Sequence, residues 1–209
     1  MEHLKRTRVK ICGITSIEDA NAAAVAGADA IGLVFYEASP RYVSINLAKQ
    51  ITDNISPLIN CVGLFVDADD AYINKVIKEV AIDTLQFHGQ ETEQACALFN
   101  RPYIKAVRMN ESICLHDEVE KYSSAKALLL DAYVKGVPGG TGKAFDWSII
   151  PNNLSKPIIL AGGLDGNNVK NAIYQVHPYA VDVSGGVEKK KGIKDPVKIK
   201  KFISETMNA

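Results

Sequence analysis

The sequence predicts an α/β fold in which residues 1–209 form a single-domain (β/α)₈ TIM barrel. Short runs rich in Val, Ile and Leu recur along the whole chain, and a segment with helical periodicity follows most of them. Eight such units of about 26 residues each fill the chain, which is near the lower end for a closed barrel. An open doubly wound sheet is the alternative, but the even spacing and two glycine-rich turns late in the chain favour closure.

The apolar runs give the expected strands, which are Arg8–Cys12, Ala30–Phe35, Asn60–Val66, Thr84–Phe87, Tyr103–Val107, Ala127–Asp131, Pro157–Ala161 and Ala180–Val183. The segments with helical periodicity give the expected helices, which are Ile17–Ala26, Leu47–Asn54, Asp70–Val80, Glu91–Asn100, Ser112–Tyr122, Asp165–Val176 and Pro196–Thr206. Ser16, Asp69 and Asp165 can cap helices, and Pro196 suits a first helical turn. The long glycine-rich stretch 132–147 is typical of a mobile active-site loop.

The composition excludes several classes of protein. Hydrophobic residues make up 47% of the chain, which is enough for a sizeable core. The chain has 24 basic and 24 acidic residues, so no overall charge draws it to nucleic acid or to an anionic membrane. The basic N-terminal segment lacks the apolar run of a signal peptide, and no stretch is long enough to span a membrane. We therefore expect a cytoplasmic protein that binds neither nucleic acid nor membrane.

The four cysteines are scattered, with no CxxC spacing and no cluster of histidines near them. This pattern indicates reduced thiols and neither a disulfide framework nor a zinc site. Cys61, Cys96 and Cys114 are interpreted as small hydrophobic residues. We expect no metal site.

Two glycine-rich turns follow the seventh and eighth expected strands. They contain Gly162 and Gly163 in LAGGLDGNNV, and Ser184, Gly185 and Gly186 in VDVSGGVE. Either turn alone could be no more than a tight turn. Two such turns on adjacent strands indicate a phosphate site, because glycine lets backbone N–H groups approach an anion closely.

Cys12 and Asp131 are the candidate catalytic residues, because active sites of such barrels lie at the carboxyl-terminal ends of the strands. Strand alternation points Lys10 and Cys12 into the barrel, and nearby positive charge is expected to help the thiol lose its proton. Asp131 ends the apolar run ALLLD, where burial favours the protonated carboxyl group that a proton donor needs. A small buried thiol and a turn-forming aspartate are the alternatives.

Strand order places the two candidates on opposite sides of the phosphate turns, since strands six, seven, eight and one are consecutive in a closed barrel. Arg41, in ASPRYVS, is the candidate for holding a second anionic group, with a solvated loop arginine as the alternative. Gln86, His88, Arg108 and Asp182 are further polar residues at strand ends. A lone histidine such as His88 is more often structural than catalytic.

The assembled motifs resemble the N-(5′-phosphoribosyl)anthranilate isomerase family of tryptophan biosynthesis. The resemblance runs from KICGIT at Lys10–Thr15 to KDPVKIKKFI at Lys194–Ile203, nearly the whole chain. Between them lie SPRYVS, VGLFVD, LQFHG, LLLD, GGTGKAFDW, LAGGL and VDVSGGVE. KICGIT together with GGTGxxFDW is specific, whereas the glycine turns occur in many phosphate-binding barrels.

The resemblance implies an Amadori rearrangement of a small phosphorylated substrate, with no metal and no cofactor. Asp131 would protonate the ribose ring oxygen as general acid, and the Cys12 thiolate would remove the C2′ proton as general base. Arg41 would bind the anthranilate carboxylate, and the two glycine turns would take the phosphate. Gln86, His88 and Asp182 would line the sugar region.

The sequence departs from the family pattern at four positions. Gly185 stands where many relatives have serine, Phe87 replaces a leucine, and Gly166 and Lys191 each replace a proline. Only the change at Gly185 is expected to alter a phosphate contact.

The chain is expected to be a monomer. Two alternatives are another phosphate-binding barrel enzyme and a non-catalytic barrel that binds a phosphorylated ligand, but the latter would not need an acid and a base together.

Overall fold

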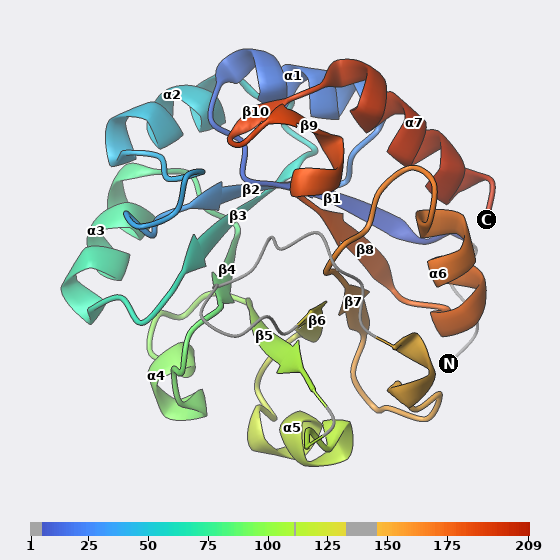
Figure 1. Cartoon of the computed structure of the whole chain (residues 1–209). Helices are drawn as coiled ribbons and strands as arrows, with labels where there is room; N and C mark the ends of the chain where they lie inside the picture. Colours follow the sequence, from blue (N-terminus) through green and yellow to red (C-terminus); the bar gives the residue numbers. More distant parts are fainter. Residues whose placement is uncertain (1–5, 111, 133–145) are drawn as a thin grey trace.

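The computed structural model describes residues 6–110, 112–132 and 146–209 of the chain, and these form a closed barrel of eight parallel strands (Figure 1). The strands follow one another around the barrel in chain order, and β1 pairs with β8 to close it. The strand bounds are β1 Arg8–Cys12, β2 Ala30–Val34, β3 Asn60–Phe65, β4 Thr84–Phe87, β5 Tyr103–Met109, β6 Ala127–Ala132, β7 Ile158–Leu160 and β8 Ala180–Val183. The predicted (β/α)₈ barrel is confirmed.

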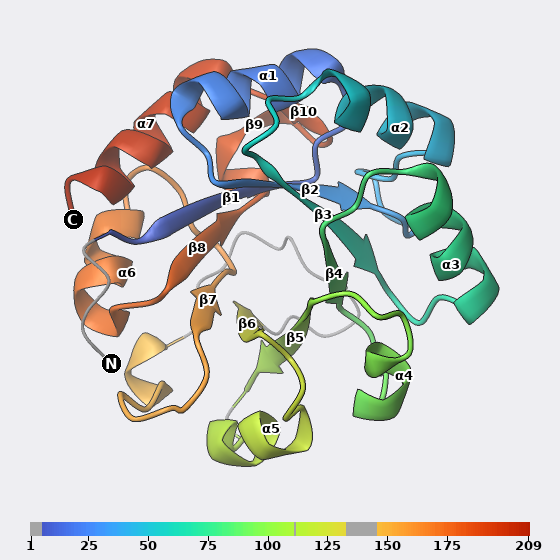
Figure 2. The ribbon, with the colours of Figure 1, turned by 180° about the vertical axis from the view of Figure 1, so that it is seen from behind.

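Helices cover the outside of the barrel, as the view from behind in Figure 2 also shows. Their bounds are α1 Ile17–Ala26, α2 Ile45–Asn54, α3 Asp70–Glu79, α4 Glu93–Ala97, α5 Leu115–Lys121, α6 Val169–Val176 and α7 Pro196–Met207, with short 3₁₀ turns at Trp147–Ile149 and Gly185–Val187. Among the described residues, no helix is long and apolar enough to cross a membrane. Most of the predicted loop 132–147 lies outside the described residues.

Several helix starts follow the capping rules. The side chains of Ser16 and Asp69 accept hydrogen bonds from backbone N–H groups of α1 and α3, as predicted. Helix α6 begins later than predicted, at Val169, but Asp165 still accepts from the N–H groups of Asn167 and Asn168 before it.

Helix α4 is shorter than predicted because Glu91 belongs to the preceding turn. Its carboxylate accepts hydrogen bonds from the backbone N–H groups of Asp67 and Gly89 and pairs with Lys105. Thr92 then caps the helix. Glu91 therefore makes tertiary contacts and does not belong to the helix, although it stands at the start of the helical sequence pattern.

A short antiparallel hairpin, β9 Glu188–Lys190 and β10 Ile193–Lys194, was not predicted. It lies between the second glycine turn and α7, where the sequence shows only a run of lysines. Strands of three and two residues are too short to produce a recognisable alternation. The hairpin matters because it brings Glu188 and Lys194 into the protein interior.

Strand alternation places polar groups inside the barrel. Val9 and Ile11 of β1 pack in the core that the helices cover, whereas Lys10 and Cys12 point inward, as predicted. The Lys10 Nζ atom lies 2.9 Å from Asp182 Oδ1, and both side chains are buried. Below them, apolar side chains fill the barrel, including Ile104, Leu129 and Ile159.

Candidate active site

One cavity of about 320 Å³ is lined by all the predicted site residues, whereas Arg108, also named as a polar residue at a strand end, does not line it. It lies at the carboxyl-terminal ends of the strands, where sites of this fold are found. The selected residues that line it are Cys12, Arg41, Gln86, His88, Asp131, Gly162, Gly163, Asp182, Ser184, Gly185 and Gly186. The barrel order places the turns after β7 and β8 between Asp131 on β6 and Cys12 on β1.

The Asp131 carboxylate is held by two contacts at the end of β6. Oδ1 accepts a hydrogen bond of 2.9 Å from the backbone N–H of Ala132, and Oδ2 lies 3.2 Å from His88 Nε2. The side chain is buried but lines the cavity. Its carboxyl group is therefore fixed in direction at the cavity wall, as a proton donor to a bound ligand would need to be.

His88 links Asp131 to Gln86. The amide Nε2 of Gln86 lies 3.1 Å from His88 Nδ1, and because an amide nitrogen only donates, Nδ1 accepts and the ring proton lies on Nε2, facing Asp131. Arg108 donates to the carbonyl oxygen of His88 at 3.3 Å. The contact between His88 and the candidate acid was not predicted, because a contact across 43 positions leaves no local signal.

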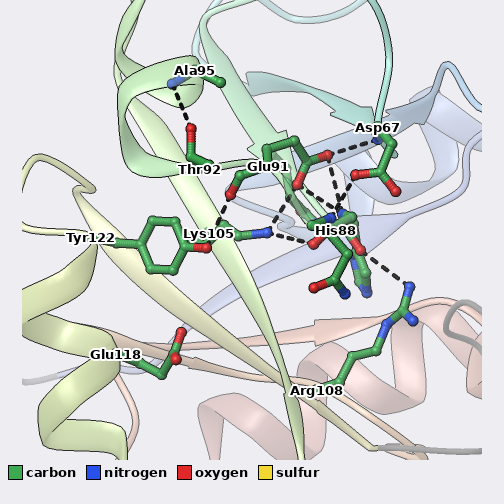
Figure 3. A network of polar contacts seen from close by, with 12 residues as sticks. Asp67, His88, Glu91, Thr92, Ala95, Lys105, Arg108, Glu118 and Tyr122 are labelled. Atoms are coloured by element: carbon green, nitrogen blue, oxygen red, sulfur yellow. Dashed lines mark hydrogen bonds and ion pairs between the residues drawn. The ribbon is translucent and has the colours of Figure 1, made fainter.

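A buried ion pair anchors the turn that carries His88 (Figure 3). Lys105 Nζ lies 2.9 Å from Glu91 Oε2 and 2.8 Å from the carbonyl oxygen of Gly89. Glu91 also accepts from the backbone N–H of Asp67, so the turns after β3 and β4 are joined. Breaking a buried pair of this kind typically costs about 3–5 kcal/mol of stability, so the turn that follows His88 is held firmly.

Cys12 lies at the end of β1 with little room around its sulfur. A Cβ atom on Gly32 would lie 2.8 Å from Cys12 Sγ and 3.2 Å from Lys10 Nζ, so the thiol and the ammonium group flank the same small space. Asp182 pairs with Lys10 from β8. Burial lowers the pKa of Lys10, but Asp182 and Cys12 together raise it above its ordinary value, so the lysine stays charged. The inward direction of Lys10 was predicted, but its pairing was not.

The expectation that Cys12 loses its proton readily is wrong. Burial raises the pKa of the Cys12 thiol, and the negative charge of Asp182 adds to the rise. Lys10 and Lys194 act in the opposite direction but do not outweigh the desolvation of the thiolate. The sequence indicated that cations lie near Cys12, but it did not show how deeply the sulfur is buried, so the net effect on the pKa of the thiol could not be predicted.

Iodoacetamide labelling at different pH values tests this point, because only the thiolate reacts. Since the pKa of Cys12 is raised, we expect its labelling to require a pH above about 8.5, the ordinary pKa of a thiol. Peptide mass spectrometry after short exposures between about pH 6 and pH 10 measures the labelling of this site. Rapid labelling of Cys12 already below about pH 8 would contradict the raised pKa.

The two glycine turns present backbone donors to the cavity. Gly162 and Gly163 have φ values of 80° and 68°, a conformation that favours glycine. A side chain on Gly186 would clash with the carbonyl oxygen of Leu164, so the turns pack directly on each other. Within the described residues, the N–H groups of Gly163, Gly185 and Gly186 have no hydrogen-bond acceptor. Free N–H groups from two adjacent turns suit an anionic ligand.

Gly185 differs from its neighbours because a side chain fits there. Its φ is not positive, and a Cβ atom would meet only Arg41 Nη2, at 3.4 Å. We therefore expect Gly185→Ser to fold normally and to bind inorganic phosphate about two- to fivefold more tightly, through one added hydroxyl donor. Calorimetric titration with phosphate measures this effect. Gly186→Ser is the contrasting variant, which we expect to unfold at a lower temperature.

Arg41 is not a solvated loop residue. Its Nε and Nη2 atoms lie 2.7 Å and 2.9 Å from the two carboxylate oxygens of Glu188, and the hydrogen bond to Glu188 raises the pKa of Arg41. Two of its N–H groups are therefore already used by a carboxylate of the protein. That Arg41 also holds a ligand carboxylate remains a prediction. Glu188 was missed because it lies on the unpredicted hairpin.

Comparison with known proteins gives a consistent result. A model of the N-(5′-phosphoribosyl)anthranilate isomerase family matches residues 9–205. The N-(5′-phosphoribosyl)anthranilate isomerase of Pseudomonas putida strain GB-1 is 56% identical over 202 residues, which cover 97% of this chain and 98% of that protein. The crystal structure of phosphoribosyl anthranilate isomerase from Thermotoga maritima has a TM-score of 0.90 at 39% identity, covering 97% of this chain and 100% of that one. A further structure, of phosphoribosyl anthranilate isomerase in complex with reduced 1-(o-carboxyphenylamino)-1-deoxyribulose 5-phosphate, has a TM-score of 0.87 at 37% identity with the same coverage.

Proposed function

Since the chain belongs to the N-(5′-phosphoribosyl)anthranilate isomerase family, we propose that its cavity isomerises N-(5-phospho-β-D-ribosyl)anthranilate to 1-(2-carboxyphenylamino)-1-deoxy-D-ribulose 5-phosphate. The reaction is an Amadori rearrangement in the biosynthesis of tryptophan. The observation that carries the assignment of roles is the placement of Asp131 and Cys12 on either side of the two glycine turns in one cavity.

Asp131 is the general acid of the first step. Its carboxyl group protonates the ribose ring oxygen, the bond between that oxygen and C1′ breaks, and the anthranilate nitrogen supplies the electron pair that forms the Schiff base. The contacts with Ala132 and His88 support this role because they direct the carboxyl group toward the cavity. His88 acts as a positioning residue in this step, and Gln86 orients its ring.

Cys12 is the general base of the second step. Its thiolate removes the proton from C2′, and the electrons of that C–H bond pass to the Schiff base to give an enolamine, which then tautomerises to the ketone. Lys10, which shares the space beside Gly32 with the Cys12 sulfur, supports the negative charge of the thiolate. Both steps are proton transfers, so they require neither a metal nor a redox cofactor.

The ends of the substrate are anionic, and each has a matching part of the cavity. The phosphate binds at Gly162–Gly163 and Ser184–Gly186, two adjacent turns with backbone N–H groups that have no acceptor among the described residues. The anthranilate carboxylate binds the guanidinium N–H groups of Arg41 that Glu188 does not use. Asp182 lies beside the sugar. We also propose that the chain acts as a monomer and that the reaction takes place in the cytoplasm.

A fluorescence assay tests the proposed function. The purified protein is mixed with N-(5-phosphoribosyl)anthranilate generated in the cuvette, and loss of anthranilate-sugar fluorescence is followed with and without a metal chelator. We expect enzyme-dependent consumption at the same rate in both conditions. A rate no faster than the buffer control would refute the assignment and would favour a barrel that binds a phosphorylated ligand without converting it.

A further inference from the structure

Three charged side chains form a buried cluster beneath the cavity. Glu188 accepts from Arg41 at 2.7 Å and 2.9 Å, and its Oε1 also lies 3.0 Å from Lys194 Nζ. The side chain of Lys194 is fully buried, that of Glu188 is 5% exposed and that of Arg41 is 12% exposed. The unpredicted hairpin supplies two of these three residues. The reaction steps described above use neither Glu188 nor Lys194.

The cluster carries more positive than negative charge. Two cations share one carboxylate, so its formal charge is one positive unit. Burial raises the pKa of Glu188, but Arg41 and Lys194 together lower it, which keeps the carboxylate ionised. The pKa of Lys194 is lowered, chiefly by burial, although the contact with Glu188 acts to raise it. An uncompensated buried charge is costly unless another group balances it.

The positive charge lies against the proposed phosphate turn. Lys194 Nζ lies 3.1 Å from the carbonyl oxygen and 3.3 Å from the hydroxyl oxygen of Ser184, the first residue of that turn. Arg41 Nη2 approaches the same turn at Gly185. The acidic Asp165 also lines this part of the cavity, but it directs its carboxylate to backbone N–H groups at the start of α6.

We propose that Lys194 is a phosphate-binding determinant, whose buried charge is balanced by the substrate phosphate on the other side of Ser184. Its ammonium group orients the Ser184 hydroxyl by donating to it, so the hydroxyl can direct its own hydrogen atom to the anion. Lys194 therefore acts in two ways: it positions the Ser184 hydroxyl, and it provides positive charge near the phosphate. This inference rests on the proposed location of the phosphate.

Lys194→Met tests the inference because it leaves the neutral pair of Arg41 and Glu188 in place. We expect the variant to bind inorganic phosphate, and sulfate as a second anion, about tenfold or more weakly, since hydrogen bonds to charged groups are strong. Its melting temperature without ligand should equal or exceed that of the wild type, because the uncompensated charge is gone. Calorimetric titration and thermal unfolding measure the two quantities without any turnover, so they stand apart from the isomerase assay.

Lys105→Met is the matched control. Lys105 is also a buried lysine paired with a glutamate, but its pair with Glu91 is balanced and does not line the cavity. Removing it leaves Glu91 without its cation, so we expect a lower melting temperature and an unchanged phosphate affinity. The two variants should therefore differ in both measurements: only Lys194→Met should lose phosphate affinity, and only Lys105→Met should unfold at a lower temperature than the wild type.

The proposal also predicts a split between the kinetic constants. Lys194→Met should raise the KM for the phosphorylated substrate in parallel with the loss of phosphate affinity, and Lys194→Arg should recover part of it. Wild-type phosphate affinity in Lys194→Met would overturn the proposal. Failure of that variant to fold would also overturn it, because the remaining ion pair would then be insufficient and the role of Lys194 would be structural.

Discussion

Asp131→Asn is expected to lower kcat for the isomerisation by about 10²–10⁴-fold, the usual contribution of a positioned general acid. Asparagine keeps the shape of the side chain and can still accept from the Ala132 N–H, so the cavity should keep its form. The amide cannot deliver a proton to the ribose ring oxygen, and the ring should stay closed. Initial rates in the fluorescence assay measure the effect.

Two measurements separate a lost acid from a damaged fold. Asp131→Asn should bind inorganic phosphate as the wild type does and should unfold within a few degrees of it. Asp53→Asn removes an exposed carboxylate of α2 that pairs with Lys49, and it should keep full activity. A turnover by Asp131→Asn within about threefold of the wild type would remove Asp131 from the role of acid.

Cys12→Ala is the second change with a large expected effect, also about 10²–10⁴-fold on kcat. The thiol is the proposed acceptor of the C2′ proton, and alanine leaves no group there that can take it. Cys12→Ser should be almost as inactive, because a hydroxyl beside Lys10 is a much weaker acid than a thiol.

The other cysteines supply the controls for this result. Cys114→Ala changes an exposed thiol, and Cys61→Ala changes a buried one outside the cavity. Both variants should keep near-normal turnover, although Cys61→Ala should be less stable. Activity in Cys12→Ala comparable to these controls would show that another group removes the proton.

Much of the site could be predicted from the sequence because it follows from strand position. Residues at the ends of strands meet at one edge of a closed barrel, so Cys12, Asp131 and the glycine turns were found without any long-range information. Strand alternation likewise predicted that Lys10 points inward. These inferences require only that side chains alternate between the two faces of a strand and that the sheet closes into a barrel.

The features that could not be predicted depend on contacts between distant parts of the chain. His88 meets Asp131, and Arg41 meets Glu188, across 43 and 147 positions respectively. The pKa shift of Cys12 was predicted in the wrong direction, because the sequence indicates which charges are near but not how deeply the sulfur is buried. Lys194 begins the motif KDPVKIKKFI, but its burial and its contacts had no local signal, since its two-residue strand has no periodicity.

The central claim is that Asp131 opens the ring before Cys12 removes the C2′ proton, and trapping the Schiff base with cyanoborohydride tests it most directly. Hydride addition to the C=N bond converts the open-chain form to a stable amine that mass spectrometry can count. We predict that Cys12→Ala yields the trapped amine well above the uncatalysed background and that Asp131→Asn yields only background. Equal trapping in the two variants, or none in Cys12→Ala, would contradict the assignment of acid and base.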